Sequence, residues 1–166
     1  TGWMFGRTPI WGMIHRTTDG GQTWTTLMDQ YDLEELQLDA QMFDADQGVS
    51  VGTGNILYTT SDGWQTWQRH TITHAEAWQA LGFATPQVGW VGSYYGAVAR
   101  TTDGGQSWTP VDLPGITTDD RITQIEAASA TEVRILASGW DRVLVYESLD
   151  GGQTWDVDDP GLLNPD

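Results

Sequence analysis

Short runs of alternating hydrophobic and polar residues cover most of the chain, and they come in sets of four. Between residues 77 and 112 the runs are 78–85, 88–93, 97–103 and 106–112, all rich in Gly, Thr, Val or Trp. Alternation with a period of two residues, interrupted by Gly- and Asp-rich turns, is typical of half-buried β-strands. The pattern therefore predicts four antiparallel strands joined by hairpins in this segment.

Three other segments divide in the same way. Residues 34–72 and 121–159 each hold four runs, at 36–43, 48–52, 55–61 and 64–72 and at 122–129, 132–139, 143–149 and 153–159. Residues 1–30 hold three, at 2–6, 13–19 and 22–28, so we expect the opening strand of this set to lie before Thr1.

One phrase, RTTDGGQTW at residues 16–24, recurs near the end of each set, with its Asp at positions 19, 62, 103 and 150. The spacing of about 40–50 residues is that of a propeller blade, and the strand-like composition argues against helical repeats of similar period. We predict an all-β protein, a β-propeller of about four blades, each a four-stranded antiparallel sheet with an Asp-box hairpin. The predicted blades are 1–30 (partial), 34–72, 77–112 and 121–159, in one domain with a tail at 160–166.

The phrase lies between the third and fourth predicted strands, where local chemistry favours a tight turn. An Asp carboxylate can accept backbone N–H groups that follow it, Gly can take the positive φ of the reversal, and Trp can fold back from the start of the outer strand. We expect the second copy, with Trp64 in a Gly position, to have a distorted turn. The residues assigned to this structural role are Asp19, Gly21, Trp24, Asp62, Trp67, Asp103, Gly105, Trp108, Asp150, Gly152 and Trp155.

These phrases resemble the Asp-box, or BNR repeat, of β-propeller proteins, which specifies the hairpin and not a function. The longer phrases at 88–108 and 2–24, with a Gly-Trp strand, a short loop and Arg-Thr-Thr-Asp-Gly-Gly, resemble the YCF48-like family. That resemblance implies a propeller of about seven blades that assists assembly or stability of photosynthetic membrane complexes such as photosystem II from the lumenal or periplasmic side. It implies protein partners and no catalysis, although this chain is shorter than such a ring.

Asp-box propellers also include enzymes, so a glycosidase or a carbohydrate-binding relative is the alternative function. The GRTP phrase at 6–9 fits the arginine motif of sialidases, where Arg would bind a substrate carboxylate. A sialidase needs further residues, for which Arg100, Arg121, Arg142, Tyr94, Tyr95 and Glu126 are available, but no spacing links them. With 23 acidic residues, no carboxylate pair stands out for a two-carboxylate glycosidase. We predict no catalytic site.

Charge and composition exclude several functions. The chain has 23 acidic residues and 7 basic ones, all Arg, and a net charge of −16, which argues against nucleic acid and anionic membrane surfaces as partners. It has no Cys, and no run approaches the ~20 apolar residues of a membrane span. The Lys-free acidic composition and a first residue other than Met suit a processed, extracytoplasmic protein: periplasmic, lumenal or secreted.

Metal and cofactor sites are not predicted. His70 and His74 have a zinc-like spacing, but they flank the end of a predicted strand, where that spacing does not align them; His15 stands apart. The acidic loops at 117–121 and 156–161 could supply oxygen ligands for Ca²⁺ but do not match an EF-hand loop. We expect no cofactor and no metal, with calcium left open.

The turns between second and third strands lie together on one propeller face, opposite the Asp-box hairpins. They carry residue types that are common at interaction hot spots, with packing between blades as the alternative role for the rings. The candidate partner-binding residues are Arg7, Trp11, Tyr94, Tyr95, Trp140 and Arg142. We expect the open edge of the ring to be covered by another protein, because two Pro in the 160–166 tail argue against a closing strand. The predicted function is a non-catalytic scaffold that binds other subunits of a complex.

Overall fold

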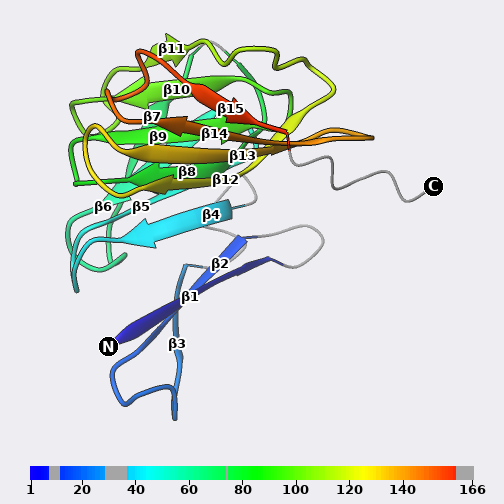
Figure 1. The fold of residues 1–166 in the computed structure, drawn as a ribbon. Coiled ribbons are helices and arrows are strands. Elements are labelled where there is room, and N and C mark those ends of the chain that lie inside the picture. The colour runs from blue at the N-terminus through cyan, green and yellow to red at the C-terminus, as the bar shows by residue number, and fades with distance from the viewer. Residues whose placement is uncertain (8–11, 29–36, 74, 160–166) are drawn as a thin grey trace.

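The computed structural model describes residues 1–7, 12–28, 37–73 and 75–159, and these form strands and turns without a helix (Figure 1). The strands are β1 (Gly2–Arg7), β2 (Gly12–Thr17), β3 (Thr25–Met28), β4 (Gln37–Met42), β5 (Gly48–Gly52), β6 (Ile56–Thr60), β7 (Gln68–Thr71), β8 (Trp78–Phe83), β9 (Gly89–Ser93), β10 (Val98–Thr101), β11 (Thr109–Val111), β12 (Arg121–Ala127), β13 (Val133–Ser138), β14 (Val143–Ser148) and β15 (Asp156–Asp158).

The strands form four antiparallel sheets in chain order, which we call blades 1 to 4. Blade 1 is β1–β2–β3, blade 2 is β4 to β7, blade 3 is β8 to β11, and blade 4 is β12 to β15. Each strand pairs with the next one along the chain, as in a propeller blade. The prediction of an all-β, propeller-type fold is confirmed.

The hydrophobic core is divided among the junctions between blades. Ile14, Ile56, Tyr58 and Trp64 form a cluster between blades 1 and 2. A second cluster joins blades 2 and 3, and a third joins blades 3 and 4. Each of them contains buried aromatic rings. The described strands pack from blade to blade through β1 with β4, β4 with β8 and β8 with β12, without a contact of similar extent between blades 1 and 4.

Side chains on the inner strands bind the backbone of the next blade. Asp39 on β4 accepts the Leu81 N–H of β8 at 2.9 Å, and Gln41 both donates to and accepts from the Phe83 backbone, at 2.8 and 2.9 Å. Burial raises the pKa of the Asp39 carboxyl, and its hydrogen bonds oppose that effect. These bonds fix the register between neighbouring inner strands.

The fourth strand of each complete blade begins later than predicted. β7, β11 and β15 start at Gln68, Thr109 and Asp156, each one residue after the Trp of the repeat. The preceding Gln and Thr or Ser stay in the turn because the Asp carboxylate holds their backbone, as described below. The prediction that the Trp begins the outer strand is wrong by this one residue.

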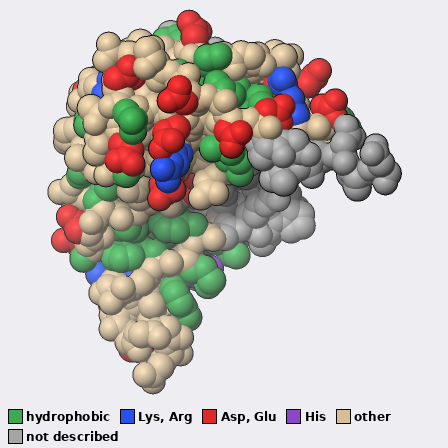
Figure 2. Space-filling view, in the orientation of Figure 1, with side chains coloured by type: hydrophobic (Ala, Val, Ile, Leu, Met, Phe, Trp, Pro, Cys, Tyr) green, Lys and Arg blue, Asp and Glu red, His purple; other side chains and the backbone are tan. Residues whose placement is uncertain are grey.

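On the face shown in Figure 2, acidic side chains are scattered over the upper part, where most of the later strands lie, and are not gathered in one patch; few Arg lie among them. A band of hydrophobic side chains crosses this face at the level of β4.

Candidate functional site

The Asp-box hairpin of blade 3 shows how the repeated phrase folds. The Thr101 hydroxyl accepts the Gly105 N–H at 2.9 Å and donates to the Asp103 Oδ1 at 2.8 Å. The Asp103 carboxylate in turn accepts the Ser107 N–H at 2.9 Å and its hydroxyl at 2.5 Å. Gly104 and Gly105 have φ values of 74° and 89°, which residues with a Cβ rarely adopt. The turn is therefore closed by bonds that span only four residues.

The other three hairpins repeat these bonds, so their Asp carboxyls share one environment. The pKa of Asp103 and that of Asp150 are both lowered to about 2. The main cause is the hydrogen bond from the hydroxyl four residues later, which is Ser107 for Asp103 and Thr154 for Asp150. The equivalent bonds from Thr23 and Thr66 lower the pKa of Asp19 and Asp62 as well. These carboxylates are held in the charged form by the turn itself, as a structural role requires.

The first hydroxyl residue of the phrase is buried in every blade, a feature that the repeat pattern alone did not predict. Thr17, Thr60, Thr101 and Ser148 are all at most 7 % exposed. Each hydroxyl accepts the N–H four residues later and donates to the Asp. Its recurrence two residues before each Asp was the available signal.

The Trp of the phrase folds back over the turn. The indole N–H groups of Trp24 and Trp108 donate to the carbonyls of Gly21 and Gly105, each at 3.1 Å. Trp108 is buried, and Trp24 is 42 % exposed. The ring of Trp67 is partly buried against the cluster between blades 1 and 2, and that of Trp155 against the cluster between blades 3 and 4.

The turn of blade 2 is not distorted, so the expectation for Trp64 is wrong. Trp64 takes a φ of 66°, and its N–H binds the Thr60 hydroxyl at 2.9 Å, as the Gly does in the other copies. The ring is fully buried against blade 1, with the Phe5 ring edge-on at 6.0 Å. Packing against the neighbouring blade offsets the cost of a left-handed backbone, which is of order 1–3 kcal/mol.

The opposite face carries exposed aromatic rings at the turns between second and third strands. Trp140, between β13 and β14, is 88 % exposed. Tyr94 and Tyr95, between β9 and β10, are 42 % and 52 % exposed and contact each other edge-on at 5.2 Å. The guanidinium of Arg121 lies 4.6 Å above the Tyr94 ring. All three rings are exposed to solvent, although Tyr94 also contacts Arg121 of blade 4, and we call them, with Arg121, the aromatic face.

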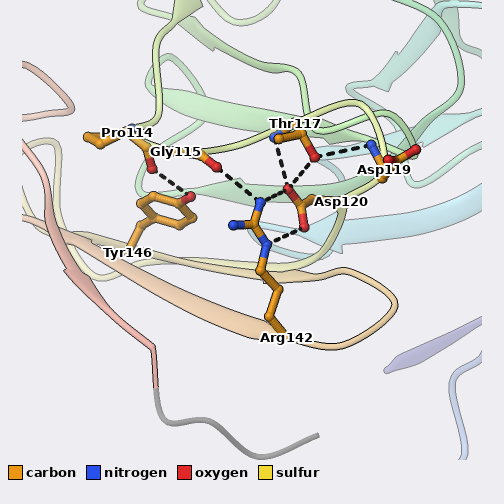
Figure 3. A network of polar contacts seen from close by, with 7 residues as sticks. All are labelled: Pro114, Gly115, Thr117, Asp119, Asp120, Arg142 and Tyr146. Atoms are coloured by element: carbon orange, nitrogen blue, oxygen red, sulfur yellow. Dashed lines mark hydrogen bonds and ion pairs between the residues drawn. The ribbon is translucent and has the colours of Figure 1, made fainter.

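Arg142 lies on this face, and its side chain bonds to the linker that joins blades 3 and 4, residues 112–120 (Figure 3). Its Nε donates to the Asp120 Oδ1 at 3.0 Å, one Nη pairs with the Asp120 Oδ2, and the Gly115 carbonyl accepts at 3.0 Å. Thr117 donates to the same carboxylate from its N–H and its hydroxyl, both at 2.8 Å. The Tyr146 hydroxyl donates to the Pro114 carbonyl at 3.0 Å. The network fastens the linker to blade 4.

A groove runs beside Tyr95 on this face. It has a volume of about 440 Å³, and its walls come from the turn at 95–98, from β11 and from the linker, including Ile116, Thr117 and Thr118. The Arg142 network holds the linker wall in place. Exposed rings next to a groove with a fixed wall suit the binding of an extended polypeptide.

Two further residues were predicted for this face. Trp11 lies outside the described residues, and only the backbone of Arg7 is described, with its Cα paired to Gly12. The structure therefore brings Tyr94, Tyr95, Trp140 and Arg142 to one face.

The residues considered for sialidase chemistry have other partners. The Arg100 guanidinium stacks on Trp90, that of Arg121 on Tyr94, and that of Arg142 binds Asp120. Glu126 is exposed on β12. The arrangement offers no cluster of arginines around a carboxylate pocket in the described part of the chain.

The histidines have local partners. His15 and His70 lie 3.0 Å from the hydroxyls of Thr26 and Thr59, whereas His74 lies outside the described residues. Within 1–7, 12–28, 37–73 and 75–159, no group of three or more His, Asp or Glu could hold a metal. The Asp120 carboxylate, in one of the proposed calcium loops, binds Arg142 and Thr117 instead. No helix long and apolar enough to cross a bilayer occurs in this part of the chain.

Comparison with known sequences identifies a family. The family model described as "Photosynthesis system II assembly factor YCF48" matches residues 27–159. A photosystem II assembly lipoprotein Ycf48 of Prochlorococcus marinus (strain MIT 9313) is 28% identical over 158 residues, which are 93% of this chain and 45% of that protein. The protein of the same name from Synechococcus sp. (strain CC9902) is 28% identical over 72% of this chain and 36% of its own length. The chain thus spans less than half of each relative.

Comparison with solved structures gives the same family and a wider group of propellers. A structure described as YCF48 bound to D1 peptide superimposes with a TM-score of 0.62 at 27% identity, over 74% of this chain and 39% of the other. A GH74 enzyme of Niastella koreensis superimposes with a TM-score of 0.74 at 17% identity, over 95% of this chain and 28% of the other. The second likeness, at this identity, shows the fold alone.

Proposed function

The chain belongs to the YCF48 family of photosystem II assembly factors, and from this premise we propose that it is a non-catalytic scaffold that binds a polypeptide segment of a photosystem subunit through its aromatic face. The observation that carries the proposal is the exposure of Trp140, 88 %, on the same face as Tyr94 and Tyr95. Leaving a Trp in water has no structural benefit, and Trp and Tyr dominate the energetics of protein interfaces.

Three features support a polypeptide as the ligand. The groove beside Tyr95 has a volume of about 440 Å³, which is large enough for several side chains. Its linker wall is fixed by the Arg142 network, so little ordering is needed on binding. A relative in the family has been solved with a D1 peptide, which makes a segment of D1 the first partner to test.

The relatives' description as lipoproteins supports a location outside the cytoplasm, at the surface of a membrane. The net charge of −16 agrees with attachment by an anchor or by a partner in preference to direct adsorption onto anionic lipid. We propose that the chain acts at the lumenal or periplasmic side of the photosynthetic membrane.

The test is binding of peptides that tile D1, measured by fluorescence anisotropy, with Trp140→Ala and Tyr95→Ala variants. We expect each variant to weaken binding about tenfold or more, the loss that about 1.4 kcal/mol produces. Leu149→Ala is the matched control, because Leu149 is a 69 % exposed hydrophobic residue near an Asp-box turn on the opposite face. Equal affinity for all three variants would contradict the proposal. Retention of glycans by the wild type, lost in Trp140→Ala, would favour the carbohydrate-binding alternative.

A further inference from the structure

Two junctions between blades are bridged by an arginine of the preceding blade. The guanidinium of Arg100 on β10 stacks on the Trp90 ring of β9, 5.2 Å from its centroid. Its Nη2 donates to the Ala130 carbonyl of blade 4 at 3.4 Å. Arg16 on β2 stacks on Trp3 in the same way, at 5.6 Å. Arginine in this repeat position therefore fills the space between its own blade and the next.

The contacts of Gly63 and Gly151 confirm that both arginines reach the next blade. A Cβ added to Gly63, in the Asp-box turn of blade 2, would lie 3.4 Å from the Arg16 Nη1. A Cβ added to Gly151, in the turn of blade 4, would lie 3.4 Å from the Arg100 Nη2. The guanidinium thus lies beside the first Gly of the neighbouring Asp-box turn in both places.

The junction between blades 2 and 3 lacks this arginine. Thr59 pairs with Val49 across β6 and β5, as Arg100 pairs with Trp90 across β10 and β9. The Thr59 side chain is too short to reach blade 3, and its hydroxyl lies 3.0 Å from the His70 Nε2. In place of the guanidinium there is a pocket of about 510 Å³ that opens on the Asp-box face.

The walls of this pocket carry the same kinds of groups that surround arginine at the other two junctions. The Pro86 carbonyl oxygen would lie 3.1 Å from a Cβ added to Gly104, and the Ala130 carbonyl oxygen 3.0 Å from one added to Gly151. Pro86 therefore presents its carbonyl as Ala130 does to Arg100. The Asp103 carboxylate lies on the same wall and adds a negative charge.

The rest of the lining also suits a planar cation. Four residues with side-chain amides, Gln47, Gln68, Gln87 and Gln106, line the pocket together with Phe43. A guanidinium can bind carbonyl and carboxylate oxygens with several N–H groups at once and can stack on a ring.

We propose that the pocket between blades 2 and 3 binds an arginine side chain of a partner polypeptide, which completes the junction that Arg16 and Arg100 complete in its neighbours. The chain is acidic and has no Lys, so a partner that brings an arginine also gains from the overall field. The site lies on the face opposite Tyr95 and Trp140, so it can be tested apart from the aromatic face.

The test uses the whole chain and the capped peptide Ac-Gly-Arg-Gly-NH2, with binding followed by NMR shifts of the His70 ring and of the glutamine side-chain amides. The peptide in which citrulline replaces arginine is the neutral control of equal shape. We expect the arginine peptide to shift these signals and the citrulline peptide to bind about tenfold more weakly, since hydrogen bonds to a charged group are the stronger ones. Equal shifts with both peptides, or no shifts, would overturn the proposal. Tighter binding of free arginine than of the capped peptide would overturn the assignment to a polypeptide.

A variant that fills the pocket from within is the second arm. Thr59→Arg restores the arginine of the neighbouring junctions, and we expect it to abolish peptide binding while the chain stays folded. Ser61→Arg brings the same charge to the exposed rim and serves if Thr59→Arg does not fold. Leu149→Arg, on the same face of blade 4, is the control for added charge and should leave binding unchanged. Undiminished binding in both pocket variants would contradict the proposed position.

Discussion

Arg142 and Asp120 form an ion pair that joins the last blade to the linker before it. The Asp120 carboxylate is 2 % exposed, whereas 31 % of the Arg142 side chain is exposed. The hydrogen bond from Arg142 is the main cause that lowers the pKa of Asp120. A buried carboxylate that keeps its charge depends on this partner, and the groove wall depends on the carboxylate.

We expect Arg142→Ala to lower the free energy of unfolding by about 1–3 kcal/mol at neutral pH, because it leaves a buried carboxylate with fewer donors. The difference from wild type should shrink as the pH falls below 3.8, the ordinary value, because the pair contributes only while Asp120 is charged. Urea unfolding at pH 7 and pH 3 measures both. Arg134→Ala is the control, since the Arg134–Glu147 pair is exposed on both sides and should matter little. An equal loss in both variants would contradict this account.

We expect Trp64→Gly to destabilise the protein although it restores the residue found in the other repeats. Loss of a fully buried ring costs about 3–5 kcal/mol, and relief of the positive φ returns about 1 kcal/mol of it. Urea unfolding followed by far-UV circular dichroism gives the net change. Trp24→Gly removes a ring that is 42 % exposed and should cost less. Stability equal to wild type in Trp64→Gly would show that the ring does not hold blades 1 and 2 together.

We expect stability to fall steeply in acid because of the Asp-box carboxyls. Their folded-state pKa values lie below the ordinary 3.8, at about 2 for Asp103 and Asp150, so the stabilisation is complete above 3.8 and is lost as the pH falls toward 2. Carboxyl carbon NMR titration of these residues, beside urea unfolding at several pH values, measures the effect. Asp103→Asn should make the acid loss less steep. Titration of Asp103 near its ordinary value would refute the turn as the cause.

We expect His70 to titrate below its ordinary pKa of 6.5. Burial lowers the pKa, and the charge of Asp103 partly opposes this. The folded state then binds fewer protons than the unfolded state, so His70 reduces stability as the pH drops through 6.5. NMR titration of the ring in the wild type and in Asp103→Asn tests this, with a still lower pKa expected in the variant. A higher pKa in the variant would contradict the role of Asp103.

The sequence predicted the blades and hairpins well for a physical reason. In the Asp-box of blade 3, the side-chain bonds of Thr101 and Asp103 reach only Gly105 and Ser107, and all four residues lie within seven positions of the chain. Strand alternation is likewise a local pattern. Trp64 shows where local prediction ends. Its backbone follows the local turn pattern, but the burial of its ring depends on packing against blade 1.

What the sequence by itself determined is the repeat: four sets of strands, their turns and the family to which they belong. The tertiary structure decided what each side chain meets across a junction. Arg142 meets Asp120, 22 residues earlier in the chain, and Arg100 meets the carbonyl of Ala130, 30 residues later. Local hydrogen bonds are encoded within one turn, whereas these contacts exist only after blades pack, so no spacing in the sequence could have identified the fixed groove wall or the pocket beside Thr59.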